Sequence, residues 1–367
     1  MRKIAILLCT VLVMSGMFSA CSAKTNTEQN AKKKIHVVTT IFPAYDWVRE
    51  ILGDQKDQVD LTLLADKGVD LHNYQPTADD LVAISSCDLF IYVGGESDEW
   101  VEDALAHADN KDRKVINLME VLGDSAKTEE VVEGMQEEDH HDTEEADHES
   151  ESAEKDSHTE EDSHEEDSHQ EEKDSHTEDS HQEEHEHEEE YDEHVWLSLK
   201  NASLFCKEIA STLSSINPAQ KETYTKNADT YVESLSQLDK AYEEAVSNAS
   251  NKTLLFGDRF PFRYLTEDYH LAYYAAFVGC SAETEASFET IKFLAEKTDE
   301  LKLPCVLTIE GATHEIAETI VANTAEKNQK ILTLDSMQSV TKDDIKNGAT
   351  YLGIMTDNLA ILKEALQ

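Results

Sequence analysis

Residues 218–247, PAQKETYTKNADTYVESLSQLDKAYEEAVS, decide the fold of this chain. The stretch has one Pro, at its start, and no Gly, and its apolar or aromatic side chains recur every three or four residues. That spacing predicts a single amphipathic helix. The face is formed by Tyr224, Ala228, Tyr231, Leu235, Leu238 and Tyr242. At about 1.5 Å per residue the helix would reach about 45 Å, long enough to run along two lobes and to limit their closure.

On both sides of this helix, short apolar runs alternate with longer amphipathic ones. Strands are predicted at residues 35–40, 59–64, 89–93, 114–118, 253–257, 273–277, 305–309 and 331–334. Helices are predicted at residues 44–52, 77–85, 98–108, 260–269, 287–301, 315–327 and 344–366. This alternation predicts parallel sheets with helices on their faces. The expected fold class is α/β, with an N-terminal lobe at 35–217, a linking helix at 218–248, a C-terminal lobe at 249–367 and a ligand site in the cleft between the lobes.

The N-terminus has the pattern of an export signal. Arg2 and Lys3 precede an apolar run at residues 4–17, which is too short to span a bilayer, and small residues stand directly before Cys21. The pattern resembles a lipoprotein signal over residues 1–20, which implies cleavage before Cys21 and a lipid on its sulfur. The alternative is secretion with Cys21 unmodified. Residues 21–34 are polar and suit a tether, so we expect a lipid-anchored monomer on the outer face of the cell membrane.

The net charge of −47 is concentrated in one segment, since residues 137–190 hold 28 Asp or Glu and 2 Lys. A charge of this sign argues against nucleic-acid binding, which requires clustered Lys and Arg. It is compatible with the attraction of cations.

The same acidic segment is rich in histidine. Asp-Ser-His recurs five times, and aliphatic or aromatic side chains are nearly absent, so we expect disorder. Imidazole is a good ligand for zinc, copper and nickel, which favours an auxiliary metal-binding loop over the alternative of a solubilising acidic loop. Its histidines are His140, His141, His148, His158, His164, His169, His176, His181, His185 and His187.

The cysteines after the signal are even in number, which permits disulfides in an oxidising compartment. They are Cys87, Cys206, Cys280 and Cys305. Cys280 and Cys305 both lie at the ends of predicted C-terminal strands and form the preferred pair. The alternative is four buried thiols.

Residues 137–190, the acidic and histidine-rich segment, form an insert between the predicted elements. Four isolated side chains outside this insert follow predicted strands or the insert itself, and each can bind a metal. They are His72, His194, Asp258 and Glu310. Because ligands of open α/β sheets bind beyond the carboxyl ends of the strands, this shared placement predicts one metal site.

At these residues the sequence resembles the solute-binding lipoproteins of zinc and manganese ABC importers, over the whole mature chain. Residues 69–76, VDLHNYQP, match the family stretch that supplies a first histidine ligand, here His72. Residues 194–197, HVWL, match the stretch after a histidine-rich loop that supplies a second, here His194. In the family, a carboxylate after a strand near the C-terminus supplies the last metal ligand, and Glu310 matches that position here.

One position departs from the family pattern. The family places His or Glu three residues before a Phe-x-Tyr stretch, and the frame at residues 262–264 puts Arg259 there. Arginine keeps its charge and cannot coordinate a metal. Asp258, a water or a histidine of the insert could complete the coordination shell of the metal. His314 is a further candidate, although its place at a helix start is the preferred explanation.

The resemblance implies an extracytoplasmic receptor that binds Zn²⁺ and delivers it to an ABC permease and its ATPase. Mn²⁺ is the alternative ion, and the histidines favour zinc because manganese binds imidazole less strongly. A surface adhesin or metal buffer is the alternative from another class. An enzyme is not expected, because the sequence has no His-Glu-x-x-His, no Ser or Cys nucleophile signature and no phosphate-binding Gly-rich loop.

Overall fold

The computed structural model describes residues 34–136, 190–281, 285–311 and 313–367. The predicted signal, nearly all of the tether, lipidation at Cys21 and the ten histidines of the insert lie outside these residues.

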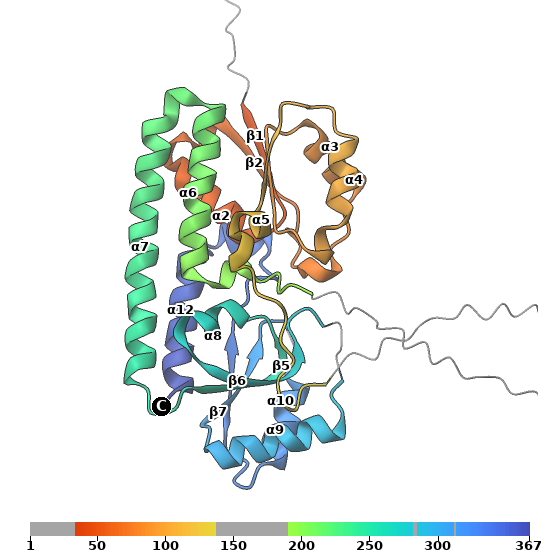
Figure 1. Ribbon diagram of the computed structural model, residues 1–367, viewed down its shortest axis with the longest axis vertical. Coiled ribbons are helices and arrows are strands. Elements are labelled where there is room, and N and C mark those ends of the chain that lie inside the picture. Colours follow the sequence, from red (N-terminus) through yellow and green to blue (C-terminus); the bar gives the residue numbers. More distant parts are fainter. Residues whose placement is uncertain (1–33, 137–189, 282–284, 312) are drawn as a thin grey trace, which may run out of the picture.

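Helix α7 (Lys221–Asn248) runs along one side of the molecule (Figure 1). All six predicted apolar positions are buried along it. Near its start, Asn227 Nδ2 donates to the carbonyl of Ile51 in α2 (Phe42–Leu52) at 2.9 Å. Near its end, the Tyr242 hydroxyl donates to the carbonyl of Met355 at 2.6 Å. The helix therefore contacts both lobes, as its spacing predicts.

The N-terminal lobe is built on a four-stranded parallel sheet in the order β2-β1-β3-β4. The strands are β1 (Ile35–Thr39), β2 (Val59–Leu63), β3 (Leu89–Tyr92) and β4 (Lys114–Asn117). Its helices are α2, α3 (Ala78–Ser86), α4 (Trp100–Ala106), α5 (Leu118–Leu122) and α6 (Leu199–Ile216). Successive residues of a strand face opposite sides, so Val37 packs in the cluster of α2 and α6, whereas Val38 packs in that of α3 and α4.

The C-terminal lobe repeats this arrangement, with a parallel sheet in the order β6-β5-β7-β8. The strands are β5 (Thr253–Phe260), β6 (Ala272–Val278), β7 (Cys305–Ile309) and β8 (Lys330–Leu334). The helices are α8 (Arg263–Tyr269), α9 (Phe288–Leu301), α10 (Glu315–Asn323), α11 (Lys342–Lys346) and α12 (Tyr351–Ala365). The α/β class with two lobes and a long helix is therefore confirmed.

Two further segments connect the lobes. Helix α12 returns to the N-terminal lobe, where the Tyr351 N–H donates to Asp46 Oδ2 at 2.7 Å. In the other direction, residues 127–136 lie on the C-terminal lobe, where the Gln136 N–H donates to the carbonyl of Ala276 at 2.9 Å. The largest buried cluster runs from Val37 to Leu366 without a break between the lobes. These contacts add to α7 in restricting movement of one lobe against the other.

The prediction of one continuous helix at residues 344–366 is wrong, because α11 and α12 are separate. Gly348 lies between them at a φ of 103°, in the left-handed region that favours glycine. The Thr350 hydroxyl then caps α12 by accepting from the Gly353 N–H. The amphipathic spacing continues across this turn, which explains why the pattern alone predicted a single helix.

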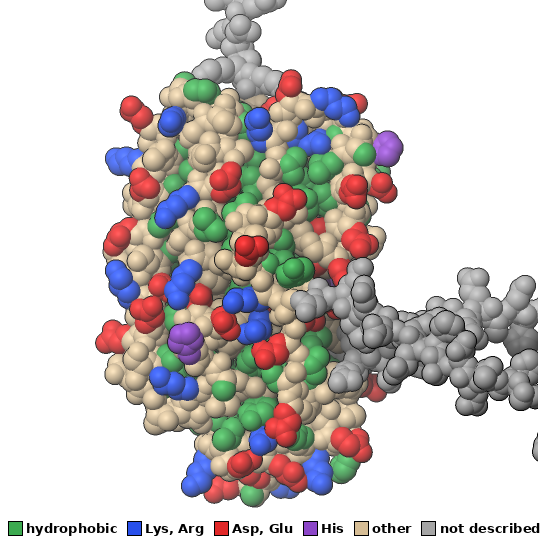
Figure 2. Space-filling model, in the orientation of Figure 1, with side chains coloured by type: hydrophobic (Ala, Val, Ile, Leu, Met, Phe, Trp, Pro, Cys, Tyr) green, Lys and Arg blue, Asp and Glu red, His purple; other side chains and the backbone are tan. Residues whose placement is uncertain are grey.

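Within the described part of the chain, no helix is both long and apolar enough to cross a bilayer. On the face shown in Figure 2, Lys and Arg side chains are interspersed with Asp and Glu. This mixed surface is ordinary for a protein in water.

Replacing Tyr242 with Ala should destabilise the fold strongly. Its ring is fully buried and stacks on Tyr269 with centroids 5.1 Å apart, so the change leaves a cavity between α7 and α8. We expect a loss of about 3–5 kcal/mol in the free energy of unfolding by urea. The exposed neighbour Glu243 is the control, and Glu243→Ala should change this free energy by no more than about 0.5 kcal/mol. Equal effects of the two changes would contradict the inward orientation of this face.

Candidate metal centre

His72 lies on a short 3-10 turn, Leu71–Asn73, that follows β2. The turn forms because the Asp70 carboxylate caps it, accepting from the His72 N–H at 3.0 Å. On the imidazole, Nδ1 is 2.7 Å from Ser97 Oγ and 3.5 Å from Glu193 Oε2. These partners fix the ring so that Nε2 points away from them.

His194 directly precedes the turn Val195–Leu197 and is fully buried. The Asp192 carboxylate holds it twice, since Oδ1 accepts from the His194 backbone N–H at 2.8 Å and lies 3.1 Å from Nδ1. Tyr264 of α8 fixes this segment in turn by donating to the Asp192 carbonyl at 3.0 Å. His194 is thus oriented by the chain before it and by the C-terminal lobe.

The two imidazoles meet through their remaining nitrogens, with Nε2 of His72 3.2 Å from Nε2 of His194. Two nitrogens bound to one tetrahedral zinc at about 2.0–2.1 Å lie about 3.3 Å apart. The Nδ1 of His194 contacts the Asp192 carboxylate and the Nδ1 of His72 contacts the Ser97 hydroxyl, and such partners orient metal-ligating histidines in proteins. The structure therefore brings His72 and His194 together in a geometry that suits one ion.

The Cys280 thiol is the third group at this point. The sulfur and one nitrogen of each histidine all lie within 4.8 Å of one another. Cys280 comes two residues after β6, at the sheet edge where ligands are expected. The sequence reasoning assigned it to a disulfide instead, although its position after a strand was the same signal that singled out Asp258 and Glu310.

The predicted pair Cys280–Cys305 does not form, and both thiols are free. Cys305 begins β7, whereas Cys280 follows the end of β6, and parallel strands put these ends at opposite edges of the sheet. The pairings of Phe256 with Ala275 and with Leu307 place Cys305 five residue levels from Val278, the last residue of β6 before the turn that carries Cys280. That is about 17 Å along the strands, against about 7 Å that a disulfide can bridge.

The Glu310 carboxylate is turned toward other donors. It accepts from the Ser336 N–H at 2.6 Å, from the Ser336 hydroxyl at 2.8 Å and from the Gln338 N–H at 3.0 Å. It does not belong to the histidine–thiol group. Glu310 nevertheless lines a neighbouring cavity of about 430 Å³, together with Asp70 and His314.

Asp258 is also held apart from the histidines. The pairing of β5 with β6 shifts between Phe256 and Arg259, and Asp258 lies in this bulge. Its Oδ1 accepts from the Arg259 N–H at 2.9 Å and its Oδ2 from the Ile309 N–H at 3.2 Å. Asp258 thus joins β5 to β7, and it is not part of the histidine–thiol group.

Arg259 lies beside the centre and pairs with the turn that carries His72. Its Nη2 donates to Asp70 Oδ2 at 2.9 Å. Its Nη1 donates to the carbonyl of Ser281 at 3.3 Å, next to Cys280. The arginine therefore joins the two chain segments on which these possible ligands stand.

Burial and charge shape the protonation of the two histidines. Burial, with the charge of His194 second, lowers the pKa of His72 to about 3, so its ring is neutral. For His194, burial lowers the pKa, but the carboxylates led by Asp192 outweigh it and the net shift is upward. At a separation of 3.2 Å, one of the two facing nitrogens carries a proton and the other presents a lone pair. A bound cation would displace that proton.

The surroundings of the centre carry an excess of carboxylates. Burial raises the pKa of Glu193 to about 7, and its Oε2 has no hydrogen-bond partner. Burial, with Glu129 next, raises the pKa of the Cys280 thiol far above its usual value. Buried acids without enough positive partners destabilise one another, and a divalent cation at the two histidines would relieve this.

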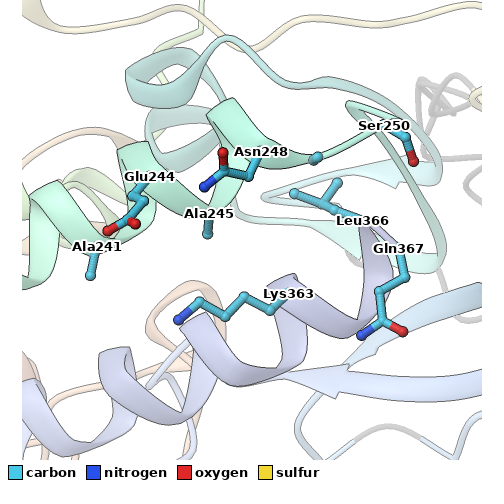
Figure 3. A pocket seen from close by; sticks show the side chains of 9 residues that line it. Ala241, Glu244, Ala245, Asn248, Ser250, Lys363, Leu366 and Gln367 are labelled. Atoms are coloured by element: carbon cyan, nitrogen blue, oxygen red, sulfur yellow. The ribbon is translucent and has the colours of Figure 1, made fainter.

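A cavity of about 440 Å³ lies elsewhere, between the ends of α7 and α12 (Figure 3). Glu244 and Lys363 are its charged lining residues. None of the predicted metal ligands lines it, so it is not the site that the sequence predicts.

Comparison with known proteins identifies the family of this chain. Residues 37–365 match the family described as zinc-uptake complex component A, periplasmic. The chain belongs to this family.

The zinc-binding lipoprotein AdcA of Streptococcus pneumoniae (strain R6) is 30% identical to this family member over 364 residues, which are 99% of the chain and 61% of that relative. The chain thus spans about three fifths of the length of that relative. The high-affinity zinc uptake system protein ZnuA of Bacillus subtilis (strain 168) is 27% identical over 95% of the chain and 94% of the relative.

Among solved structures, the Zn(II)-bound ZnuA-like domain of Streptococcus pneumoniae AdcA matches this family member with a TM-score of 0.62 and 27% identity. The match covers 91% of this chain and 99% of the chain in that solved structure. The metal-dependent lipoprotein YcdH of Bacillus subtilis matches with a TM-score of 0.64 at 24% identity, and this likeness concerns the fold.

Replacing Asp192 with Asn should weaken metal binding while leaving both histidines in place. The amide can still accept from the His194 N–H, but it lacks the charge that makes the imidazole a stronger ligand. We expect a loss of about tenfold to hundredfold in zinc affinity, measured by competition with a chelator. The exposed Glu289, replaced by Gln, is the control. An unchanged affinity in Asp192→Asn would mean that zinc does not bind His194.

Proposed function

We propose that this protein is an extracytoplasmic receptor that binds zinc through His72 and His194 and delivers it to an ABC permease and its ATPase. The observation that carries the proposal is the approach of two imidazoles to 3.2 Å, each with a carboxylate within 3.5 Å of its other nitrogen. The names of the relatives, a zinc-binding lipoprotein and a zinc-uptake protein, support the same ion.

Zinc is preferred over manganese because of the donor atoms. Neutral imidazole suits zinc, whereas manganese favours carboxylate, carbonyl and water oxygens. The nearby oxygen ligands predicted from the sequence, Asp258 and Glu310, already accept backbone N–H groups. As direct ligands both stay predictions, and either would have to give up these donors to bind the ion.

The remaining parts of the proposal concern the chain outside the lobes. Lipidation at Cys21 would hold the receptor at the outer face of the membrane. The histidines of residues 137–190 would bind further ions weakly and exchange them with the central site. Such a receptor releases its ion unchanged, so we assign it no catalytic reaction.

A protein lacking residues 137–189 should still bind one zinc tightly, because the two histidines lie outside that segment. In this background His72→Ala and His194→Ala should each lower the affinity by more than about 100-fold, since each removes a direct ligand. The exposed His107, replaced by Ala, is the control. Isothermal titration calorimetry gives the stoichiometry. Absence of any stoichiometric zinc in the truncated protein would overturn the receptor proposal.

Loss of the central site should also abolish transport. In a strain from which the gene is deleted, and which has no second zinc receptor, the intact protein should restore growth in zinc-poor medium. The His194→Ala protein should not, and added zinc should restore growth in both cases. Equal complementation by the two proteins would favour a metal buffer or adhesin over a transport receptor.

A further inference from the structure

We propose that Cys280 is the third protein ligand of the zinc, so that this receptor holds its ion with two imidazoles and one thiolate. The inference rests on the proposed function, because it concerns the same ion at the same histidines. It changes the chemistry of the site from nitrogen and oxygen donors to nitrogen and sulfur donors.

The first support is the position of the sulfur. A thiolate at about 2.3 Å and an imidazole nitrogen at about 2.0–2.1 Å from a tetrahedral zinc are about 3.6 Å apart. The sulfur of Cys280 and the nitrogens of His72 and His194 already lie within 4.8 Å of one another. A local contraction of about 1.2 Å at most brings the three groups to bonding positions. No other group of three His, Cys, Asp or Glu meets this spacing in the part of the chain that the structure describes.

The backbone at Cys280 is built for close approach to His194. The preceding residue is Gly279, and a Cβ at that position would lie 3.1 Å from His194 Cε1 and 2.9 Å from the Phe260 carbonyl. Both distances are too short for ordinary contact, so only glycine lets the chain come this near to the imidazole. On the other side, the Cys280 N–H donates to Glu129 Oε1 at 3.0 Å. The turn is therefore fixed with its thiol beside the two histidines.

Arg259 explains why a thiol is needed. It stands at the position where the resemblance places a nitrogen or oxygen ligand, and it cannot bind a metal. It instead joins Asp70, two residues before His72, to Ser281, one residue after Cys280. The arginine is therefore a positioning residue that holds the histidine turn against the cysteine turn. The ligand lost at Arg259 is supplied by the neighbouring turn that the arginine holds.

The oxygen candidates are less suited to this role. Glu310 accepts three hydrogen bonds, all from Ser336 and Gln338, and Asp258 accepts two from backbone N–H groups. Cys280 would give up only the hydrogen bond between its thiol and Glu129. On binding, the zinc–sulfur bond forms as the S–H proton leaves to solvent, and the charge of the ion favours this loss even where burial disfavours a free thiolate.

A thiolate ligand sets the selectivity of the site. Soft sulfur donors favour zinc and other thiophilic ions over manganese, which prefers oxygen. With three protein ligands, a fourth position remains for water or for a further side chain. Such an open position is compatible with release of the ion to a partner protein.

The test is titration of the full chain with Co²⁺, which takes zinc sites and shows a near-ultraviolet sulfur-to-cobalt band only where a thiolate binds. The histidine-rich segment contains no cysteine, so it cannot contribute to this band. We expect the band in the unchanged protein and in Cys305→Ser, which removes a buried thiol at the far edge of the sheet. Cys280→Ser should lose the band and weaken zinc binding by about 100-fold or more.

A second measurement needs no substitution. X-ray absorption at the zinc edge of the protein loaded with one zinc should contain a zinc–sulfur distance of about 2.3 Å. Absence of this distance, or a sulfur band that persists in Cys280→Ser, would overturn the inference. If Cys280→Ser kept full zinc affinity while His72→Ala and His194→Ala lost it, the thiolate would be excluded and the receptor function would stand. If all three variants still bound zinc tightly, both the thiolate ligand and the receptor function would be refuted.

Discussion

The candidate metal centre and the function proposed for it depend on the approach of two imidazole nitrogens to 3.2 Å. Two such groups cannot both carry a proton at this distance, so one ring presents a lone pair to the N–H of the other. Each ring keeps its orientation because its other nitrogen has a hydrogen-bond partner, the Ser97 hydroxyl at His72 and the Asp192 carboxylate at His194. Removal of the shared proton leaves two lone pairs directed at one point, which is a binding site for a divalent cation.

This convergence requires that the two lobes hold still relative to each other. Helix α7 contacts both, α12 returns from the second lobe to the first, and residues 127–136 lie on the second. The ion pair of Arg259 with Asp70 joins the lobes directly beside the centre. Ordering of the ligands is thus achieved during folding, so less conformational entropy is lost on binding. Movement that admits or releases the ion is then expected in the short turns that carry the ligands rather than in rotation of whole lobes.

The sequence predicted the framework and part of the centre. Periodicity located the eight strands and α7, because burial on one face leaves a regular pattern along the chain. The rule that ligands follow strands singled out His72, the family resemblance supported His194, and the structure brings these two side chains together. The rule was not applied to Cys280, because the sequence pattern made this cysteine the preferred disulfide partner of Cys305. Glu310 and Asp258 occupy the expected sheet edge, but hydrogen bonds to Ser336 and Ile309 direct their carboxylates elsewhere, and such local bonds leave no trace in spacing.

A crystal structure of the zinc-loaded protein, with anomalous scattering recorded at the zinc edge, tests the central claim most directly. The account predicts one strong anomalous peak about 2.0–2.1 Å from Nε2 of both His72 and His194. A fully occupied zinc bound elsewhere on the chain, with the two imidazoles still facing each other and no peak between them, would contradict it.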